Sequence, residues 1–339
     1  MGGGLMQLVA YGAQDVYLTG NPQITFFKVV YRRHTNFACE AIEQTFNGSP
    51  TLGGKSTVQI TRNGDLVTKM WLKTTMTKAA SAVTDAGYQI INSVELQIGG
   101  TKIDKHYGRW MHVWSQLTRT DEHNEAHTQL IAPAAATTSA TLYVPLQFFC
   151  CRNDGLALPL IALQYHDVRL EFDFATVTNV TKIENTTLLV NYVYLDSEER
   201  KRFAQASHEY LIEQLQFTGV ETVKAAAATE KVRLNFNHPV KELVWGIDRD
   251  FGVFNTSDDP GLQSITTALL QLNGHDRFSA ETGKYFNYVQ PHTHHTKSPS
   301  LGLCVYSFAL NPEEHQPSGT CNFSRIDNAT LSITNGTTA

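Results

Sequence analysis

Apolar and polar residues alternate in short runs along most of the chain, and residues typical of turns close these runs. A period of two puts successive side chains on opposite faces of a strand, so the pattern predicts half-buried β-strands. Three hairpins are predicted, because Asn-Gly and Gly-Gly readily adopt the positive-φ positions of a tight turn. They join 57–61 through Asn63-Gly64 to a strand from Leu66, 94–98 through Gly99-Gly100 to 101–103, and 269–272 to a turn at Asn273-Gly274.

Helical spacing is found mainly in two stretches, which are predicted to be short helices between strands. Residues 107–130 place Trp110, Val113, Trp114 and Leu117 on one face, and residues 197–204 form the second stretch.

Two segments rich in small residues follow a different pattern. Residues 132–139 are interpreted as a surface loop and 224–229 as a linker or exposed turn, because small side chains bury little area when they are ordered.

An internal repeat organises the strands. Ile60 and Trp71 lie 11 residues apart, as do Leu234 and Trp245, and both pairs flank turn residues. The offset is 234 − 60 = 174 and 245 − 71 = 174, and the stretch 96–100 recurs at 270–274 with the same offset. Later in the chain, 163–170 resembles 323–331 with an offset of 160, so shorter loops are expected there. The repeat predicts a duplicated all-β domain.

Length and charge fit this organisation. A chain of 339 residues is long enough for two cores of roughly 150 residues each. Only 17% of the residues are charged, against about 25% in an average soluble domain, so much of the surface is expected to be neutral and to pack against neighbours. The net charge of −5 and the small size of the two basic clusters, 32–34 and 200–202, argue against wrapping of nucleic acid.

Cysteine usage and hydropathy exclude several classes of protein. The five cysteines form an odd set without a Cys-x-x-Cys motif, which favours reduced thiols. The longest apolar run, 156–163, is interrupted by Pro159, so no transmembrane helix is expected. The first residues lack the basic segment of a secretion signal, and Met6 departs from the myristoylation pattern. Neither secretion nor lipid anchoring is predicted.

Candidate catalytic and metal-binding residues are better explained as structural or solvated. His292, His294 and His295, with His275, invite a metal site, but residues 291–299 have the composition of a loop. His123 and His127 have helical spacing, yet the stretch is not His-Glu-x-x-His, so a solvated helix or loop is predicted. The acidic pairs at 248/250 and 258/259 are interpreted as loop residues. No nucleotide-binding or nucleophile motif is present. We therefore predict no enzyme activity, cofactor or metal; use of the seven glycosylation sequons is left open.

Several long stretches carry a resemblance to a known family. Residues 8–28 read LVAYGAQDVYLTGNPQITFFK and are continued by Tyr31-Arg32-Arg33. They closely resemble the N-terminus of the major capsid proteins of nucleocytoplasmic large DNA viruses, especially those of algal viruses. Further matching blocks are 62–66, 98–100 with 103–107, 155–165, 203–205, 209–217, 234–239 and 317–329. The resemblance covers nearly the whole chain.

The resemblance implies a fold and an organisation of the chain. The fold is all-β, with two consecutive eight-stranded jelly rolls and short helices in the loops between strands. The expected parts are an N-terminal arm at 1–24, a first jelly roll at 25–212, a linker at 213–224 and a second jelly roll at 225–339. Members of the family usually continue beyond the strand near Thr334 to a last strand, whereas this chain ends at Ala339. Its second roll is either truncated or finished differently.

The resemblance also implies a role in assembly. The chain is expected to form homotrimers of pseudo-hexagonal outline that pack with neighbouring capsomers and minor capsid proteins. The capsomers would lie over an internal viral membrane, which the chain does not span. No direct binding to the genome is expected. The expected location is the virion, after assembly in the host cytoplasm. The arm is expected to contact neighbours through Leu8, Tyr11, Gln14, Asp15, Tyr17 and Leu18. A carbohydrate-binding jelly roll is the second hypothesis and a metal-dependent enzyme the third.

Overall fold

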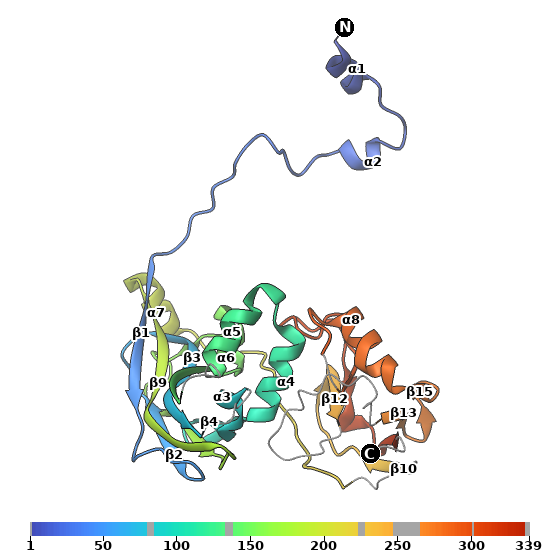
Figure 1. Cartoon of the computed structure of the whole chain (residues 1–339). Coiled ribbons are helices and arrows are strands. Elements are labelled where there is room, and N and C mark those ends of the chain that lie inside the picture. The colour runs from blue at the N-terminus through green and yellow to red at the C-terminus, as the bar shows by residue number, and fades with distance from the viewer. Residues whose placement is uncertain are drawn as a thin grey trace. The chain divides into compact units, whose positions relative to one another are not determined.

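The computed structural model of the protein describes residues 2–79, 85–132, 138–222, 228–246, 265–299 and 302–335. The chain divides into two compact units, Met1–Asn36 and Phe37–Ala339. The first unit carries two short helices, α1 (Gly3–Val9) and α2 (Val16–Thr19), and no strand among its described residues. All the described strands belong to the second unit (Figure 1).

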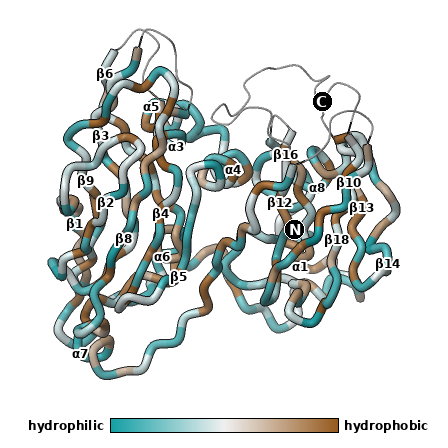
Figure 2. Tube along the Cα trace, turned by 90° about the horizontal axis from the view of Figure 1, so that it is seen from below, coloured by the Kyte–Doolittle hydropathy of each residue, from teal (hydrophilic) through white to brown (hydrophobic). Residues whose placement is uncertain are grey.

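The first half of the second unit is a jelly roll of two antiparallel sheets. One sheet has the order β1-β9-β3-β6, with the short β7 beside β3, and the other has the order β2-β8-β4-β5. The strands are β1 (Phe37–Thr45), β2 (Lys55–Ile60), β3 (Leu66–Lys78), β4 (Ile91–Ile98), β5 (Thr101–Tyr107), β6 (Ser139–Pro145), β7 (Leu158–Pro159), β8 (Val168–Phe174) and β9 (Val180–Leu195). The alternation of apolar and polar residues along β4 and β8 is visible in Figure 2. It places one face of each strand in the core.

The second half repeats this strand order in part. One sheet has the order β10-β18-β13-β14, with β15 beside β13, and two further pairs are β12-β16 and β11-β17. The strands are β10 (Thr229–Arg233), β11 (Pro239–Val240), β12 (Glu242–Gly246), β13 (Ile265–Leu272), β14 (His275–Asp276), β15 (Glu281–Thr282), β16 (Leu303–Ser307), β17 (Cys321–Asn322) and β18 (Ala329–Asn335). The predicted succession of two jelly rolls is therefore confirmed. The second roll has no counterpart of β1 or β9 among its described strands.

The 174-residue repeat is visible in the strand boundaries. The ends of β4 and β13 differ by 265 − 91 = 174 and 272 − 98 = 174. Trp71 lies in β3 opposite Pro145 of β6, and Trp245 lies in β12 opposite Cys304 of β16. The two tryptophans therefore occupy corresponding strands of the two rolls. The predicted boundaries at residues 24, 212 and 224 stay predictions.

Two of the three predicted hairpins are confirmed and one is wrong. β4 and β5 pair through a turn in which Gly99 and Gly100 have positive φ, and β13 and β14 pair through Asn273-Gly274. By contrast, β2 pairs with β8, whereas β3 pairs with β6, β7 and β9. The Asn63-Gly64 stretch therefore crosses from one sheet to the other.

Short helices are inserted between strands. They are α3 (Ala86–Gln89), α4 (Gly108–Thr118), α5 (Asn124–Ile131), α6 (Phe149–Arg152), α7 (Ser197–Gln205) and α8 (Gln290–His294), with short 3-10 turns at Asp121–His123, Asp154–Leu156 and Phe323–Arg325 and a π-helix at Tyr285–Val289. The helix predicted at 107–130 is divided at Arg119-Thr120 into α4 and α5. The helix predicted at 197–204 is confirmed as α7. Most of the two segments rich in small residues lies outside the described residues.

The core of the first roll lies between its two sheets. Side chains from both sheets are fully buried there, including those of Val58, Leu72, Phe172 and Tyr192. Phe46, which directly follows β1, meets Phe172 edge to face with ring centroids 5.3 Å apart. Such aromatic contacts add to the burial of apolar area and help to fix the distance between the sheets.

Candidate functional site

The six predicted contact residues of the arm lie in or beside its two helices. Leu8 belongs to α1, and Tyr17 and Leu18 belong to α2, while Tyr11, Gln14 and Asp15 lie between the helices. The carboxylate of Asp15 accepts a hydrogen bond from the N–H of Gly12 at 2.8 Å, and the hydroxyl of Thr19 donates to the carbonyl of Asp15 at 2.8 Å. Asp15 therefore shapes the turn into α2.

The apolar side chains of the arm are exposed. The exposed fractions are 76% for Leu8, 90% for Tyr17 and 86% for Leu18. The same holds for two residues that follow the arm, Phe27, at 98%, and Tyr31, at 88%. Single exposed apolar residues are common, but a continuous run of them marks a surface that another protein covers. This arm is the clearest candidate contact surface in the described part of the chain.

A half-buried chain of charges links the two rolls. The guanidinium of Arg152 lies 3.9 Å from the ring centroid of Trp114 in α4, and its Nη1 donates to Glu213 Oε2 at 3.2 Å. Glu213 also pairs with Lys241, which comes just before β12. The ammonium of Lys241 donates further to the carbonyl of Glu314 at 2.6 Å. Removal of Arg152, Glu213 or Lys241 would leave a neighbouring charge without its partner in a poorly solvated place, which would lower the stability of the fold.

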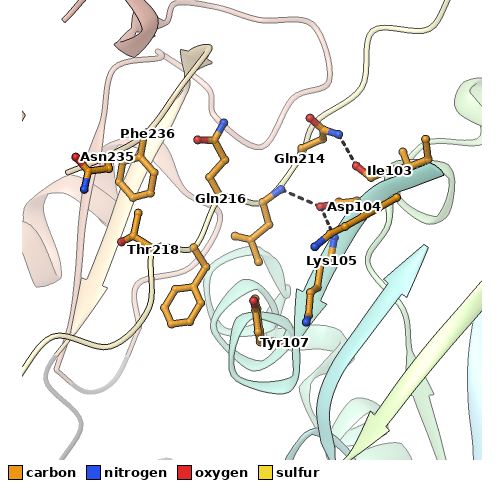
Figure 3. A pocket seen from close by; sticks show the side chains of 12 residues that line it. Ile103, Asp104, Lys105, Tyr107, Gln214, Gln216, Thr218, Asn235 and Phe236 are labelled. Carbon is orange, nitrogen blue, oxygen red and sulfur yellow. Dashed lines mark hydrogen bonds between the residues drawn. The ribbon is translucent and has the colours of Figure 1, made fainter. Parts of the chain in front are cut away.

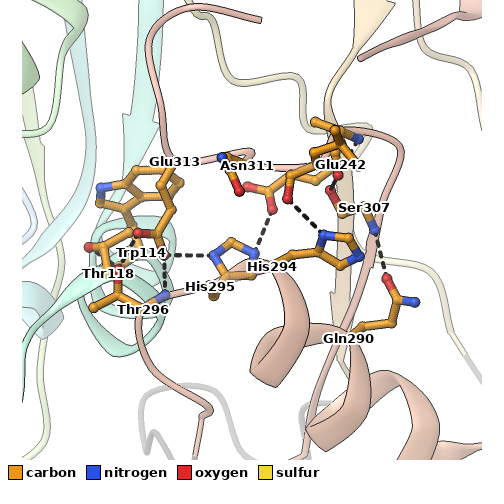
Figure 4. Close-up of polar contacts among 12 residues, drawn as sticks. Trp114, Thr118, Glu242, Gln290, His294, His295, Thr296, Ser307, Asn311 and Glu313 are labelled. Atoms are coloured by element: carbon orange, nitrogen blue, oxygen red, sulfur yellow. Dashed lines mark hydrogen bonds and ion pairs between the residues drawn. The ribbon is translucent and has the colours of Figure 1, made fainter. Parts of the chain in front are cut away.

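His295 forms the centre of a second buried network, shown in Figure 4. Its Nε2 lies 2.8 Å from Glu242 Oε2 at the start of β12, and its Nδ1 lies 2.9 Å from Glu313 Oε1. The side chain of His295 is completely buried. Burial lowers the pKa of His295, but the hydrogen bonds to Glu242 and Glu313 outweigh this effect and raise the pKa to about 9. His295 is therefore an imidazolium held between two carboxylates at neutral pH.

The residues after His295 contact the first roll. The backbone N–H of Lys297 donates to the carbonyl of Leu117 in α4 at 2.9 Å, and its ammonium pairs with Asp121 at 2.7 Å. Thr296 also donates to Glu313 through its N–H and its hydroxyl, at 2.9 and 2.5 Å. The His295 network thus fixes the loop after α8, and this loop contacts the first roll through Lys297.

A cleft of about 330 Å³ lies where β5 meets residues 214–218, as Figure 3 shows. Gln214 donates to the carbonyl of Ile103, and the N–H of Leu215 donates to Asp104 Oδ1 at 3.2 Å. Asp104 Oδ2 lies 2.8 Å from Nε2 of the buried His106. Burial lowers the pKa of His106 despite the contact with Asp104. These contacts hold the segment after α7 against the edge of the first roll.

Two further histidines, His112 and His127, lie between α3, α4 and α5. His127 Nε2 lies 3.0 Å from the hydroxyl of Tyr88, and His112 Nε2 accepts from the amide of Gln116 at 2.6 Å. Burial and the charge of Arg119 lower the pKa of both histidines to about 4. The prediction of a solvated segment thus holds for the exposed His123 but was wrong for His127, which packs on Tyr88.

The loop predicted at 291–299 is wrong for His292 and His294 and right for His295, which lies in the loop that follows α8. His292 and His294 belong to α8, which continues directly from the π-helix at Tyr285–Val289. His294 Nδ1 lies 2.9 Å from the carbonyl of Leu310, and His275 is exposed in β14. The described residues contain no cluster of three His, Cys, Asp or Glu side chains suited to a metal ion. The absence of a metal stays a prediction, and the acidic pairs at 248/250 and 258/259 lie outside the described residues.

The five cysteines are free thiols. The Sγ atoms of Cys150 and Cys151 lie 3.9 Å apart, and Cys39 is exposed. Burial raises the pKa of the Cys304 thiol to about 12. Among the described helices, none is long and apolar enough to cross a membrane.

Comparison with known proteins identifies the family. Residues 25–196 match the family described as the major capsid protein N-terminus, and residues 199–339 match the large eukaryotic DNA virus major capsid protein. The major capsid protein of Pyramimonas orientalis virus is 52% identical over 376 residues, covering 98% of this chain and 92% of that protein. That of Paramecium bursaria Chlorella virus 1 is 46% identical, covering 98% and 87%.

Solved structures agree with this assignment. VP54 of PBCV-1 superposes with a TM-score of 0.87 at 41% identity, covering 93% of this chain and 88% of that one. The Faustovirus major capsid protein superposes with a TM-score of 0.71 at 11% identity, covering 96% and 91%, which supports the fold. Two successive jelly rolls of this kind define a structural subunit of a viral shell. The chain belongs to the major capsid proteins of large eukaryotic DNA viruses and is part of the capsid shell.

The buried charge networks were not predicted from the sequence. A signal for one of them exists, because Ile42-Glu43-Gln44 of β1 recurs as Ile212-Glu213-Gln214. No local pattern marks His295, because its partners Glu242 and Glu313 are far away in sequence.

Proposed function

We propose that three copies of the chain associate into a homotrimer that acts as one capsomer. Two rolls with the same strand order carry this proposal, because a three-fold ring of two similar domains has six similar lobes. A pseudo-hexagonal outline of this kind suits close packing in an icosahedral shell. The capsomer acts as a structural unit, without enzymatic activity.

The arm is proposed to contact neighbouring capsomers or minor capsid proteins through Leu8, Tyr11, Gln14, Asp15, Tyr17 and Leu18. Its exposed apolar side chains support this role. The capsomers would lie over an internal viral membrane that the chain does not span. The net charge of −5 argues against direct contact with the genome. Assembly is proposed to take place in the host cytoplasm.

Light scattering on the purified full chain tests the trimer. The expected mass is about 113 kDa, three times 37.7 kDa. A folded chain that stays monomeric at every concentration would contradict the proposal.

Charged substitutions test the arm. Leu8→Asp, Tyr17→Asp and Leu18→Asp together should raise the protein concentration needed for association between copies by at least about tenfold, because apolar anchors dominate interfaces. Tyr165→Asp is the control, since Tyr165 is 88% exposed but lies outside the arm. Equal association of both variants and the unchanged chain would exclude an arm contact.

A further inference from the structure

The two sheets of the first roll differ in the side chains that they turn away from the core. In the sheet β2-β8-β4-β5, one row across the four strands is buried, namely Val58, Leu170, Leu96 and Asp104. The rows on either side of it therefore face outward. Both outward rows are polar throughout, with Gln59, Arg169, Gln97 and Lys102 in one and Thr57, Glu171, Glu95 and Lys105 in the other. This face has the composition of a sheet face that stays in water.

The sheet β1-β9-β3-β6 turns apolar side chains outward. Its buried row across the four strands consists of Gln44, Leu188, Leu72 and Val144. The neighbouring outward row contains Leu189, Trp71 and Pro145 beside Glu43. Two further apolar residues lie on the same face, Tyr143 two residues before Pro145 and Ala41 two residues before Glu43. We name the five residues Ala41, Trp71, Tyr143, Pro145 and Leu189 the apolar sheet face.

The apolar sheet face is not covered by the core or by the second roll. Ala41 is exposed and the other four residues are half-buried, and Trp71, Tyr143 and Leu189 lie outside the core of the first roll. The strands β1 and β9 lie on the side of the first roll away from the second roll (Figure 1, Figure 2). The described part of the second roll contacts α4 instead, where Lys297 donates to Leu117. The apolar sheet face is therefore available to another molecule.

The sheet that carries this face is large enough for a stable contact. Its strands β1, β9, β3 and β6 have 9, 16, 13 and 7 residues. At about 3.3 Å per residue and about 4.8 Å between strands, they cover roughly 700 Å². Each partner buries about 800 Å² in a standard interface, and tryptophan and tyrosine are enriched at its centre. The area and the residues therefore fit a protein partner.

The charged residues beside the apolar sheet face form a neutral pair. The ammonium of Lys73 in β3 lies 2.5 Å from Glu43 Oε1 in β1, so this pair reaches across β9. The hydroxyl of Thr187 in β9 donates to Glu43 Oε2 at 3.2 Å. Each chain has a net charge of −5, and like charges brought together at a contact would oppose association. A neutral face avoids this repulsion, so a second copy of the chain is a suitable partner.

We propose that the apolar sheet face packs against the second roll of another copy of the chain. Because the chain is part of a capsid shell, its neighbours include further copies of itself. In a ring of three copies, each first roll lies between its own second roll and that of the next copy. The apolar sheet face lies on the side away from its own second roll. The inference rests on the proposed association of copies, and it specifies which face of the first roll makes the contact.

Photo-crosslinking in the full chain tests the proposal. Tyr143 is replaced by benzoylphenylalanine, and the protein is mixed with an isotopically heavy copy so that crosslinks between copies can be told from those within one. We expect crosslinks from Tyr143 to residues 229–335 of a second copy. The control probe replaces Thr57, which is also half-buried in an edge strand but faces outward from the polar sheet. Its crosslinks between copies should be at least about tenfold fewer, because a half-buried polar face offers no apolar contact.

A matched pair of double variants tests the contribution of the face to association. Ala41→Lys with Leu189→Lys should raise the protein concentration needed for association at least about tenfold, because each lysine must lose water in the contact. Thr57→Lys with Gln59→Lys adds the same charge to the polar sheet and should change this concentration by less than about twofold. Light scattering on a dilution series measures both, and urea unfolding shows whether each variant is folded. If Leu189→Lys prevents folding, Ala41→Lys alone, at an exposed residue, should still raise the concentration about threefold.

The possible outcomes separate this proposal from the proposed function. Crosslinks from Tyr143 to the arm or the first roll of a second copy would overturn the second roll as the partner and leave association intact. No crosslink between copies from Tyr143 in associated material, with equal association of the lysine variants, would overturn the apolar sheet face as a contact and leave the homotrimer standing. An unchanged chain that stays monomeric in light scattering would overturn the proposed function, and this inference with it.

Discussion

The two jelly rolls share a strand order, but their described strands differ in how they pair. In the first roll β9 runs between β1 and β3, and the inner residues of β2, β3 and β8 are buried. In the second roll β12 pairs with β16 alone among the described strands, and the inner face of β10 stays half-buried. The comparison shows that a repeated pattern of apolar residues goes with a repeated strand order, whereas the burial of matching residues differs with the elements that pack on them.

The largest expected effect is a difference between matched core residues. Ile60→Ala should lower the free energy of unfolding by about 4 kcal/mol, because the buried side chain leaves a cavity. Leu234→Ala, 174 residues later, should cost about 2 kcal/mol, since part of its surface is already in water. Urea unfolding of the two variants measures both values. Equal losses would show that both rolls are equally well covered in solution.

The second prediction concerns the charged centre near β12. His295→Gln should lower the free energy of unfolding at pH 7 by about 3 kcal/mol, because Glu242 and Glu313 would then face each other without a cation.

The pH dependence of the unchanged chain follows from the same contact. The pKa of His295 in the folded chain is about 9, above the ordinary histidine value of 6.5. Its contribution is fully present below pH 6.5 and is lost as the pH rises through 9. Thermal unfolding between pH 6 and 10 should therefore show the unchanged chain converging on the variant. His292→Gln, at an exposed residue of α8, is the control and should keep the full pH dependence.

The third prediction gives the first roll the opposite pH dependence. Burial and the charges of Arg119 and His127 lower the pKa of His112 to about 4, below the ordinary histidine value of 6.5. The unfolded chain then binds more protons, so stability is fully present above pH 6.5 and falls as the pH drops towards 4. The loss from this residue is up to about 3 kcal/mol. His112→Gln should flatten the acid side of the unfolding curve, whereas His123→Gln, at an exposed residue, should not. An unchanged acid slope in His112→Gln would contradict this account.

The sequence predicted the elements that depend on local pattern and missed those that depend on distant partners. Strand alternation, the hairpins at Gly99-Gly100 and Asn273-Gly274, and α7 follow from neighbouring residues, and all were found. The partners of β2 and β3 were predicted wrongly, because pairing in a jelly roll joins segments more than 100 residues apart. The His295 and Arg152 networks could not be predicted for the same reason, because their members lie far apart in the sequence. The family resemblance, carried by long matching stretches, supplied the fold that local pattern could not.

The smallest predicted effect compares the two Asn-Gly stretches. Asn273 has a φ of +51°, and its side chain accepts a hydrogen bond from the N–H of Asn328 at 3.1 Å. Asn273→Ala should therefore cost about 1 kcal/mol, because alanine disfavours positive φ and cannot accept this bond. Asn63 is exposed and lacks a positive φ, as does Gly64, so Asn63→Ala should change stability by less than about 0.5 kcal/mol. Gly64 matters for another reason, since a Cβ there would lie 2.9 Å from the Cβ of Tyr192. Urea midpoints of the two alanine variants measure the difference, and a larger loss at Asn63 than at Asn273 would mean that the first stretch forms a turn after all.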